Sequence, residues 1–249
     1  MTDQFQGNYD CMVIGAHPDD AELCCGGTIA KLTREGKKVV LVDLTRGEMG
    51  TRGNSDIREQ EAIDAAKILG VDERINLEMR DGFIRNDEES IYKIVSVVRK
   101  FRPKIILMHP WFERHPDHEN THYLVRDSLF KCGLRRFETF DEQGKPHEIY
   151  RTRRIFCYMQ AYQFPKPADF FVDITDVHDI KIDAIKAFSS QVFVPGKYES
   201  EPKTRLSSPE FMEELVARAR YFGGLNGVKY AEGFLSVEPI IMDSLSKLL

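Results

Sequence analysis

Runs of aliphatic residues alternate with helical patterns through the first half of the chain, and this alternation limits the fold more than any other feature. Strand-like runs occur at residues 11–16, 37–44, 75–79 and 104–109. Helical patterns follow them at residues 21–35, 57–70, 90–101 and 118–132. Strands connected by helices of this length form right-handed crossovers and a mainly parallel sheet. The pattern predicts a three-layer, Rossmann-like α/β fold, in one domain over residues 1–249.

The second half is less regular. Residues 169–174 resemble a strand, and residues 177–188 and 208–227 resemble helices. The segment between these helices, residues 195–209, is a long polar loop, and such loops in compact domains often act as lids. At the start of the helix over residues 57–70 we expect Ser55 or Asp56 as the N-cap, because both residue types favour that position.

Composition excludes several classes of protein. The chain has 249 residues and a formal net charge of −5, with both signs mixed, which argues against nucleic acid as a partner. It contains no apolar run of membrane-spanning length and begins with a polar segment that lacks a signal-peptide core. Its five cysteines are an odd number without a CxxC pair. We therefore expect a cytoplasmic protein with reduced thiols and no membrane partner.

Polar side chains gather where the predicted strands end. Ligands of open α/β sheets bind at the carboxyl ends of strands. This rule brings three loops into one crevice: Ala16–Glu22, Thr45–Asn54 and His109–Asn120. The first and third loops each contain a His-Pro-Asp unit, His17-Pro18-Asp19-Asp20 and His115-Pro116-Asp117-His118.

These units supply the ligand types that a catalytic zinc ion uses, which are imidazole nitrogen and carboxylate oxygen. A cation would also relieve the repulsion between the adjacent Asp19 and Asp20 carboxylates. A simpler interpretation makes Asp19 or Asp20 the N-cap of the next helix, and gives Asp117 the same role in its own helix. The occurrence of the unit at two strand ends favours a site.

The same residues resemble a known family. GAHPDDAE at residues 15–22, GGT at 26–28 and RHPDH at 114–118 resemble the zinc-dependent N-deacetylases of the PIG-L or LmbE-like type. Residues 43–53, 57–70 and 219–234 resemble the branch that deacetylates N-acetylglucosaminyl malate in bacillithiol biosynthesis. The resemblance implies an LmbE-like fold and a hydrolase that cleaves an amide C–N bond and releases acetate.

Residue roles follow from that resemblance by matching positions. It implies one Zn2+ per chain, with Fe2+ as an alternative, held by His17, Asp20 and His118. It makes Asp19 the general base that activates water and His115 a cation that stabilises the oxyanion. Asp117 would orient a histidine. Arg58 would bind substrate, although it also lies one helical turn from Glu61 and within reach of an ion pair.

Other interpretations remain open at this stage. The substrate is expected to be a small N-acetylglucosamine conjugate, with malate as the specific aglycone. The alternatives are another conjugate of this sugar, a bacillithiol-conjugate amidase, a sugar- or nucleotide-binding module without catalysis, and a metallophosphoesterase. The resemblance also implies a homo-oligomer, a trimer or hexamer. His109 has no assigned role, and His122 is expected on a helix surface.

Overall fold

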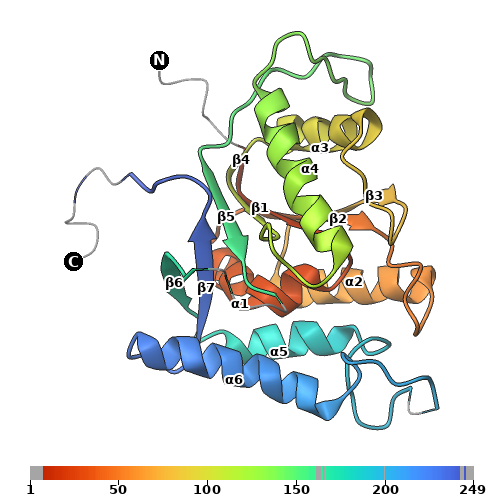
Figure 1. Cartoon of the computed structure of the whole chain (residues 1–249), viewed down its shortest axis with the longest axis vertical. Coiled ribbons are helices and arrows are strands. Elements are labelled where there is room, and N and C mark those ends of the chain that lie inside the picture. Colours follow the sequence, from red (N-terminus) through yellow and green to blue (C-terminus); the bar gives the residue numbers. More distant parts are fainter. Residues whose placement is uncertain (1–7, 161–163, 165, 199, 242–243, 245–249) are drawn as a thin grey trace.

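A seven-stranded sheet organises the chain in the computed structural model, which describes residues 8–160, 164, 166–198, 200–241 and 244. The strand order is β3-β2-β1-β4-β5-β7-β6 (Figure 1). The strands are β1 (Tyr9–Gly15), β2 (Val39–Thr45), β3 (Glu73–Met79), β4 (Pro103–Met108), β5 (Arg154–Tyr158), β6 (Phe170–Asp173) and β7 (Ala231–Ser236). The helices are α1 (Asp20–Arg34), α2 (Ser55–Leu69), α3 (Glu88–Phe101), α4 (Pro116–Cys132), α5 (His178–Ala187) and α6 (Pro209–Leu225).

The five strands from β3 to β5 in this order pair in parallel, whereas β7 is antiparallel to both β5 and β6. The predicted three-layer α/β fold with a mostly parallel sheet is therefore confirmed. The strand β7 was not predicted, because its six residues carry a glycine and no extended aliphatic run. Within the described residues, no helix has the length and apolar character needed to cross a membrane.

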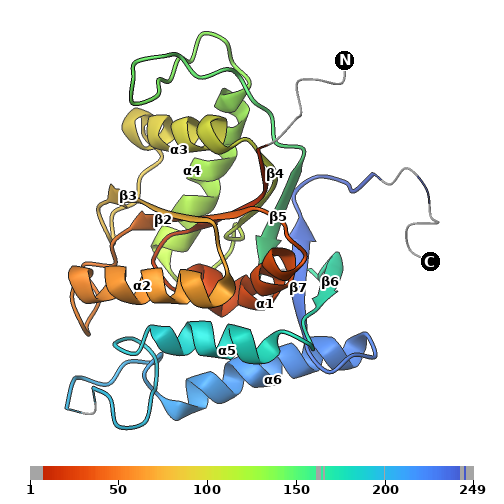
Figure 2. The same ribbon diagram turned by 180° about the vertical axis from the view of Figure 1, so that it is seen from behind.

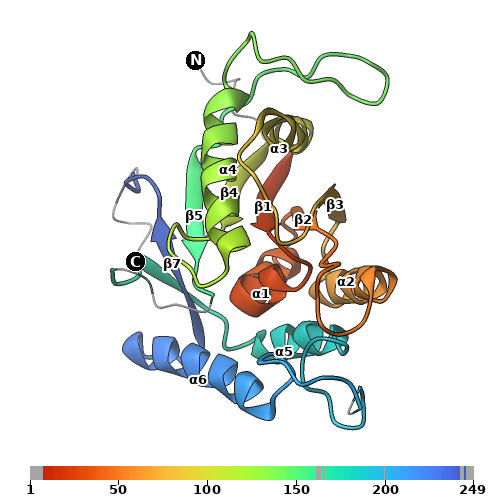
Figure 3. The same ribbon diagram turned by 45° about the vertical axis from the view of Figure 1, so that its right-hand side comes forward.

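Helices cover both faces of the sheet (Figures 1 and 2). Successive residues of β1 point to opposite faces, as the two-residue period of a strand requires. Met12 and Ile14 pack in a core with residues of α3 and α4. Cys11 and Val13 pack in a second core with residues of α1 and α5. Figure 3 shows α6 beyond α5 on this second side. All five cysteines are buried free thiols.

The N-cap of α2 is Asn54, whose side chain accepts a hydrogen bond from the Ile57 amide at 2.9 Å. The expectation of Ser55 or Asp56 was wrong by one residue. Asn, Ser and Asp are about equally favoured at this position, so a run of three such residues leaves the choice to tertiary contacts.

Helix α1 is bent at Cys25, whose φ of −138° is not helical. After the bend, the backbone amides of Gly27 and Thr28 donate to the carboxylate of Glu232 in β7, at 3.0 and 2.7 Å. Lys181 of α5 pairs with the same buried carboxylate at 2.6 Å. Glu232 thus acts as a side-chain cap for the second part of α1, where backbone donors lack intrahelical partners.

Gly27 lies where α1 packs most closely on the segment after β6. A Cβ atom at this position would lie 2.7 Å from Cδ1 and 2.8 Å from Cβ of Ile174. We expect Gly27→Ala to lower the free energy of unfolding by about 1–2 kcal/mol, because overpacking outweighs the gain in helix propensity. Urea denaturation measures this change.

Gly224→Ala is the matched control, because Gly224 is also helical and no described atom would lie within 4 Å of an added Cβ. This variant should be unchanged or more stable by about 0.4–1 kcal/mol. Equal stabilities of the two variants would contradict the packing argument.

Candidate metal centre and active site

A cavity of about 1030 Å³ opens at the carboxyl ends of the parallel strands. Each of the three loops predicted to share a crevice lines it. His17, Asp19 and Asp20 come from the first loop, Met49 and Gly50 from the second, and the third contributes Glu113, Arg114, His115 and His118. Residues of α6 and of the segment before β6 form a further part of the wall. The rule that places ligands at strand ends therefore located the cavity correctly.

His17, Asp20 and His118 form a close triangle inside this cavity. His17 Nδ1 lies 3.5 Å from Asp20 Oδ2, and His118 Nε2 lies 3.4 Å from Asp20 Oδ1. The two ring nitrogens, His17 Nδ1 and His118 Nε2, are 3.3 Å apart. Ligands of a tetrahedral zinc ion are separated by about 3.4 Å when the metal–nitrogen bonds are ~2.05 Å. The two carboxylate contacts use different Asp20 oxygens, and one ligand atom from each residue lies within 4.8 Å of the others. The donor types and this proximity suit one divalent ion with three protein ligands.

The local backbone explains how Asp20 reaches this position. Asp19 occupies the N-cap position of α1 with φ of 116°, and its side chain makes no capping hydrogen bond. Asp20 Oδ2 instead accepts a hydrogen bond from the His17 amide at 2.8 Å. Asp19 therefore occupies the N-cap position that one interpretation of the sequence gave it, but its carboxylate makes no capping hydrogen bond with α1.

Two carboxylates hold the other nitrogen of His17. Nε2 lies 3.1 Å from Asp81 Oδ1 and 3.4 Å from Asp117 Oδ2. Although burial opposes it, contacts with Asp117, Asp20 and Asp81 raise the pKa of His17 well above its usual value. The surroundings of this ring therefore carry an excess of negative charge, which favours a cation at the site.

Asp81 was missed in the sequence, although a carboxylate just past the end of β3 was a usable signal. Asp117 also accepts the amides of Gly82 at 2.8 Å and Ile84 at 3.3 Å, so it bonds another loop and does not cap α4. The capping role belongs to His115, whose Nδ1 accepts the Asp117 amide at 3.2 Å.

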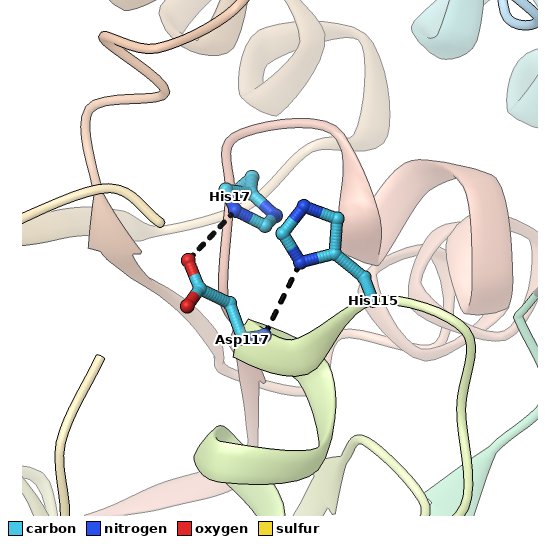
Figure 4. Close-up of side chains that lie close together, drawn as sticks. All are labelled: His17, His115 and Asp117. Atoms are coloured by element: carbon cyan, nitrogen blue, oxygen red, sulfur yellow. Dashed lines mark hydrogen bonds and ion pairs between the residues drawn. The ribbon is translucent and has the colours of Figure 1, made fainter. Parts of the chain in front are cut away.

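His17, His115 and Asp117 form a second group of metal-type ligands (Figure 4). In this group, the Asp117 carboxylate and Nδ1 of His115 already have hydrogen-bond partners. The Asp117 carboxylate bonds two backbone amides and His17, while His115 Nδ1 faces the Asp117 amide. We therefore favour the triangle of His17, Asp20 and His118 as the metal site.

Two buried histidines support that triangle. The His109 ring stacks on the His118 ring with centroids 4.3 Å apart, and its Nε2 lies 3.1 Å from Asp20 Oδ2. His122 is buried, and its Nδ1 donates to the His109 carbonyl at 2.9 Å. The expectation that His122 lies on a helix surface was wrong, because α4 turns this residue towards the strand that ends at Met108.

Asp19 lies beside the triangle and faces a guanidinium. Arg58 Nη2 is 3.0 Å from Asp19 Oδ2 and also contacts the Pro18 carbonyl. Burial raises the pKa of Asp19 to about 7, against the charge of Arg58 and with the help of Asp20. A carboxyl group with this pKa exchanges a proton near neutral pH, as a general base requires.

The alternative pairing of Arg58 with Glu61 is wrong. Glu61 turns away and accepts hydrogen bonds from the amide and hydroxyl of Ser190, both at 2.7 Å. Arg58 Nη1 instead faces Gln191 Oε1 at 3.4 Å. Arg58 thus joins the cavity wall in contact with the expected base.

Burial is the main influence on the pKa of two imidazoles of the site, those of His118 and His115. Burial lowers the pKa of His118 well below its usual value, and neutral imidazole is the form that binds a metal. Burial and the nearby His17 also lower the pKa of His115. Because Nδ1 of His115 accepts a hydrogen bond, its proton is assigned to Nε2. The direction of this pKa shift runs against the cationic ring that the family resemblance implies, and the role of His115 stays a prediction.

The loop over residues 195–209 borders the cavity through Arg205 and Leu206. Arg52 Nη2 donates to the Tyr198 carbonyl at 2.7 Å, and its Nε lies 3.8 Å from Glu201 Oε2. The loop over residues 45–54, which contains Arg52, is therefore connected to the loop over residues 195–209. The expectation that the loop over 195–209 acts as a lid stays a prediction.

Comparisons with known proteins agree with this geometry. Residues 12–129 match the PIG-L family, described as GlcNAc-PI de-N-acetylase. A diacetylchitobiose deacetylase of Thermococcus kodakarensis is 33% identical over 93% of this chain and 84% of its own length. A 4-oxalmesaconate hydratase of Pseudomonas putida is 26% identical over 94% of this chain and 92% of its own.

Among solved structures, the conserved protein TT1542 of Thermus thermophilus superposes with a TM-score of 0.81 at 34% identity. The match covers 94% of this chain and 97% of that one. The matched segment 12–129 contains the metal triangle, Asp19 and Arg58, and the deacetylase similarity extends through the rest of the fold. The chain therefore belongs to the PIG-L family of de-N-acetylases.

Proposed function

We propose that this N-deacetylase removes the acetyl group from an N-acetylglucosamine conjugate. The observation that carries the proposal is the triangle of His17, Asp20 and His118 with the Asp19 carboxylate directly beside it. Three metal-type ligands and an adjacent acid with a pKa of about 7 are the parts that amide hydrolysis needs. The deacetylase of 33% identity supports the same reaction and sugar.

PIG-L deacetylases depend on a metal, and we propose Zn2+ here, held by His17, Asp20 and His118. Nitrogen and oxygen ligands also accept Fe2+, which remains the alternative. When bound, such an ion polarises the amide carbonyl and makes a water nucleophilic at neutral pH. Asp117 and Asp81 would keep the His17 ring oriented for this task.

The protein's own groups handle the protons. We assign the water's proton to Asp19 Oδ1, because Oδ2 faces Arg58. The same carboxyl group then delivers that proton to the departing amine. His115 lines the cavity and, with a proton on Nε2, donates a hydrogen bond to the oxyanion that develops on the carbonyl.

The aglycone is the finer part of the proposal. Resemblance of residues 43–53 and 219–234 to the bacillithiol branch favours N-acetylglucosaminyl malate. Arg114 and Arg218 in the cavity wall suit a dicarboxylate. Diacetylchitobiose, the substrate named for the archaeal relative, is the alternative.

A substrate comparison tests this proposal. Protein loaded with Zn2+ is given N-acetylglucosaminyl malate, diacetylchitobiose or free N-acetylglucosamine, and acetate release is measured. We expect the malate conjugate to have the highest kcat/KM. Equal rates on all three would remove the malate assignment, and no acetate from any would contradict deacetylation of this sugar.

The roles of Asp19 and His118 can be separated by two variants. Asp19→Ala should keep bound zinc and lose most turnover, because the proton acceptor is removed while the three ligands stay. His118→Ala should lose both zinc and turnover. Metal content by plasma mass spectrometry and kcat are measured together. Near-normal kcat in zinc-loaded Asp19→Ala would show that another group is the base.

We expect Asp81 to affect the affinity for the metal, although it is not itself a ligand. Removing a carboxylate that orients a ligating histidine typically weakens metal affinity by about 10–100-fold. We expect this loss for Asp81→Asn in a competition titration with a zinc chelator. Asp127→Asn is the control, since Asp127 bonds Asn86 on the outside of α4. Equal affinities in the two variants would contradict the orienting role.

A further inference from the structure

We propose that Arg218 is a specificity residue that binds an anionic group, a carboxylate or a phosphate, on the aglycone of the substrate. This inference rests on the proposed function, because it assumes that the cavity binds an N-acetylglucosamine conjugate. It adds the requirement that the substrate carries an anionic group in addition to the acetamido sugar.

Arg218 lies on α6 and lines the same cavity as the metal triangle. Its Nη1 donates to the Gln160 carbonyl, and its Nη2 lies 3.3 Å from the Leu23 carbonyl. Both partners adjoin the metal site, since Leu23 is in the first turn of α1 and the Gln160 side chain donates to Asp20 Oδ1 at 2.5 Å. The guanidinium is thus held in a fixed place next to the reacting end of the cavity.

The charge of Arg218 is not balanced in the way that other cavity cations are. Three of these have acidic partners: Arg58 with Asp19, Arg205 with Glu214, and Lys166 with Asp169. Within residues 8–160 and the other described segments, the hydrogen bonds of Arg218 go to backbone carbonyls. Burial is the main influence on the pKa of Arg218 and lowers it, against smaller effects of Cys24, Glu232 and Glu113. A half-buried cation without an acidic partner at ion-pair distance favours an anionic ligand.

Apolar side chains line the part of the cavity wall that Arg218 shares on α6. Leu215 and Phe222 lie one turn before and one turn after Arg218 on α6 and line the cavity with it. Phe171 and Phe211 extend the same wall. Apolar surroundings lower the local dielectric and strengthen an ion pair, and the planar guanidinium matches a carboxylate or phosphate through two parallel hydrogen bonds.

Arg114 is the competing candidate, because it also lines the cavity. Its side chain is exposed, however, so a charge interaction there is screened by solvent and contributes little. The structure therefore favours Arg218 as the residue that distinguishes charged from neutral substrates.

Three ligands of one sugar test the proposal. N-acetylglucosaminyl malate carries carboxylates, N-acetylglucosamine 1-phosphate carries a phosphate, and methyl N-acetylglucosaminide is neutral. The kcat/KM of each is measured for zinc-loaded wild type and for Arg218→Gln, Arg218→Lys, Arg114→Gln and Arg220→Gln. Arg220, two residues along α6, is the matched control, because it lies over the Tyr230 ring and outside the cavity lining.

We expect Arg218→Gln to reduce the ratio of kcat/KM for an anionic substrate over the neutral one by about 10–100-fold, the usual weight of a charged hydrogen bond. Arg218→Lys should retain part of the preference, and Arg220→Gln all of it. Loss of the preference in Arg114→Gln but not in Arg218→Gln would overturn the assignment. So would an equal loss of activity on all three substrates in Arg218→Gln, which would indicate a positioning role through Gln160 and Leu23.

Calorimetric binding of the deacetylated products separates this inference from the proposed function. Wild type should bind glucosaminyl malate or glucosamine 1-phosphate more tightly than methyl glucosaminide, even if acetate release fails. The product that binds more tightly shows whether the anionic group is a carboxylate or a phosphate. Equal binding of charged and neutral products by wild type overturns the role of Arg218, and this result does not depend on the folding of any variant.

Discussion

The carboxylate of Asp20 is the contact on which the site depends. It accepts the His17 amide after β1 at 2.8 Å and the Gln160 side chain after β5 at 2.5 Å, and it lies 3.1 Å from His109 after β4. These are the carboxyl ends of three neighbouring parallel strands. One buried acid therefore sets the spacing of three loops, and the metal triangle forms only because those loops are held together.

The bend in α1 allows this carboxylate to be placed separately from the rest of the helix. The first turn follows the strand-end loop and carries Asp20, whereas the part after Cys25 is oriented by Glu232 and by the close packing of Gly27. A straight helix would have a single axis, so the position of Asp20 in the cavity and the packing of Gly27 could not be set independently. Interruptions of regular helical geometry often occur at functional sites for this reason.

Local patterns predicted the parallel sheet and the three converging loops, because strand and helix periodicity and two His-Pro-Asp units are short-range signals. The choice of His17, Asp20 and His118 within those units came from the family resemblance. These short-range signals could not predict contacts between residues far apart in the sequence. Asp81, Gln160 and the Arg58–Asp19 pair join positions 39 to 140 residues apart, and no spacing rule connects them. The proximity of Glu61 to Arg58 on one helix even suggested the wrong partner. The oligomeric state and the single-domain boundary stay predictions.

The positive φ of Asp19 affects the balance between the stability of this fold and its catalytic activity. A φ of 116° belongs to a region that L-residues with a side chain rarely occupy, and such conformations cost of order 1–3 kcal/mol. Glycine would relax the chain at this position but has no carboxyl group. The surrounding fold therefore compensates for a residue that is unfavourable for folding, and selection for thermal robustness alone would act against the side chain that we propose as the base.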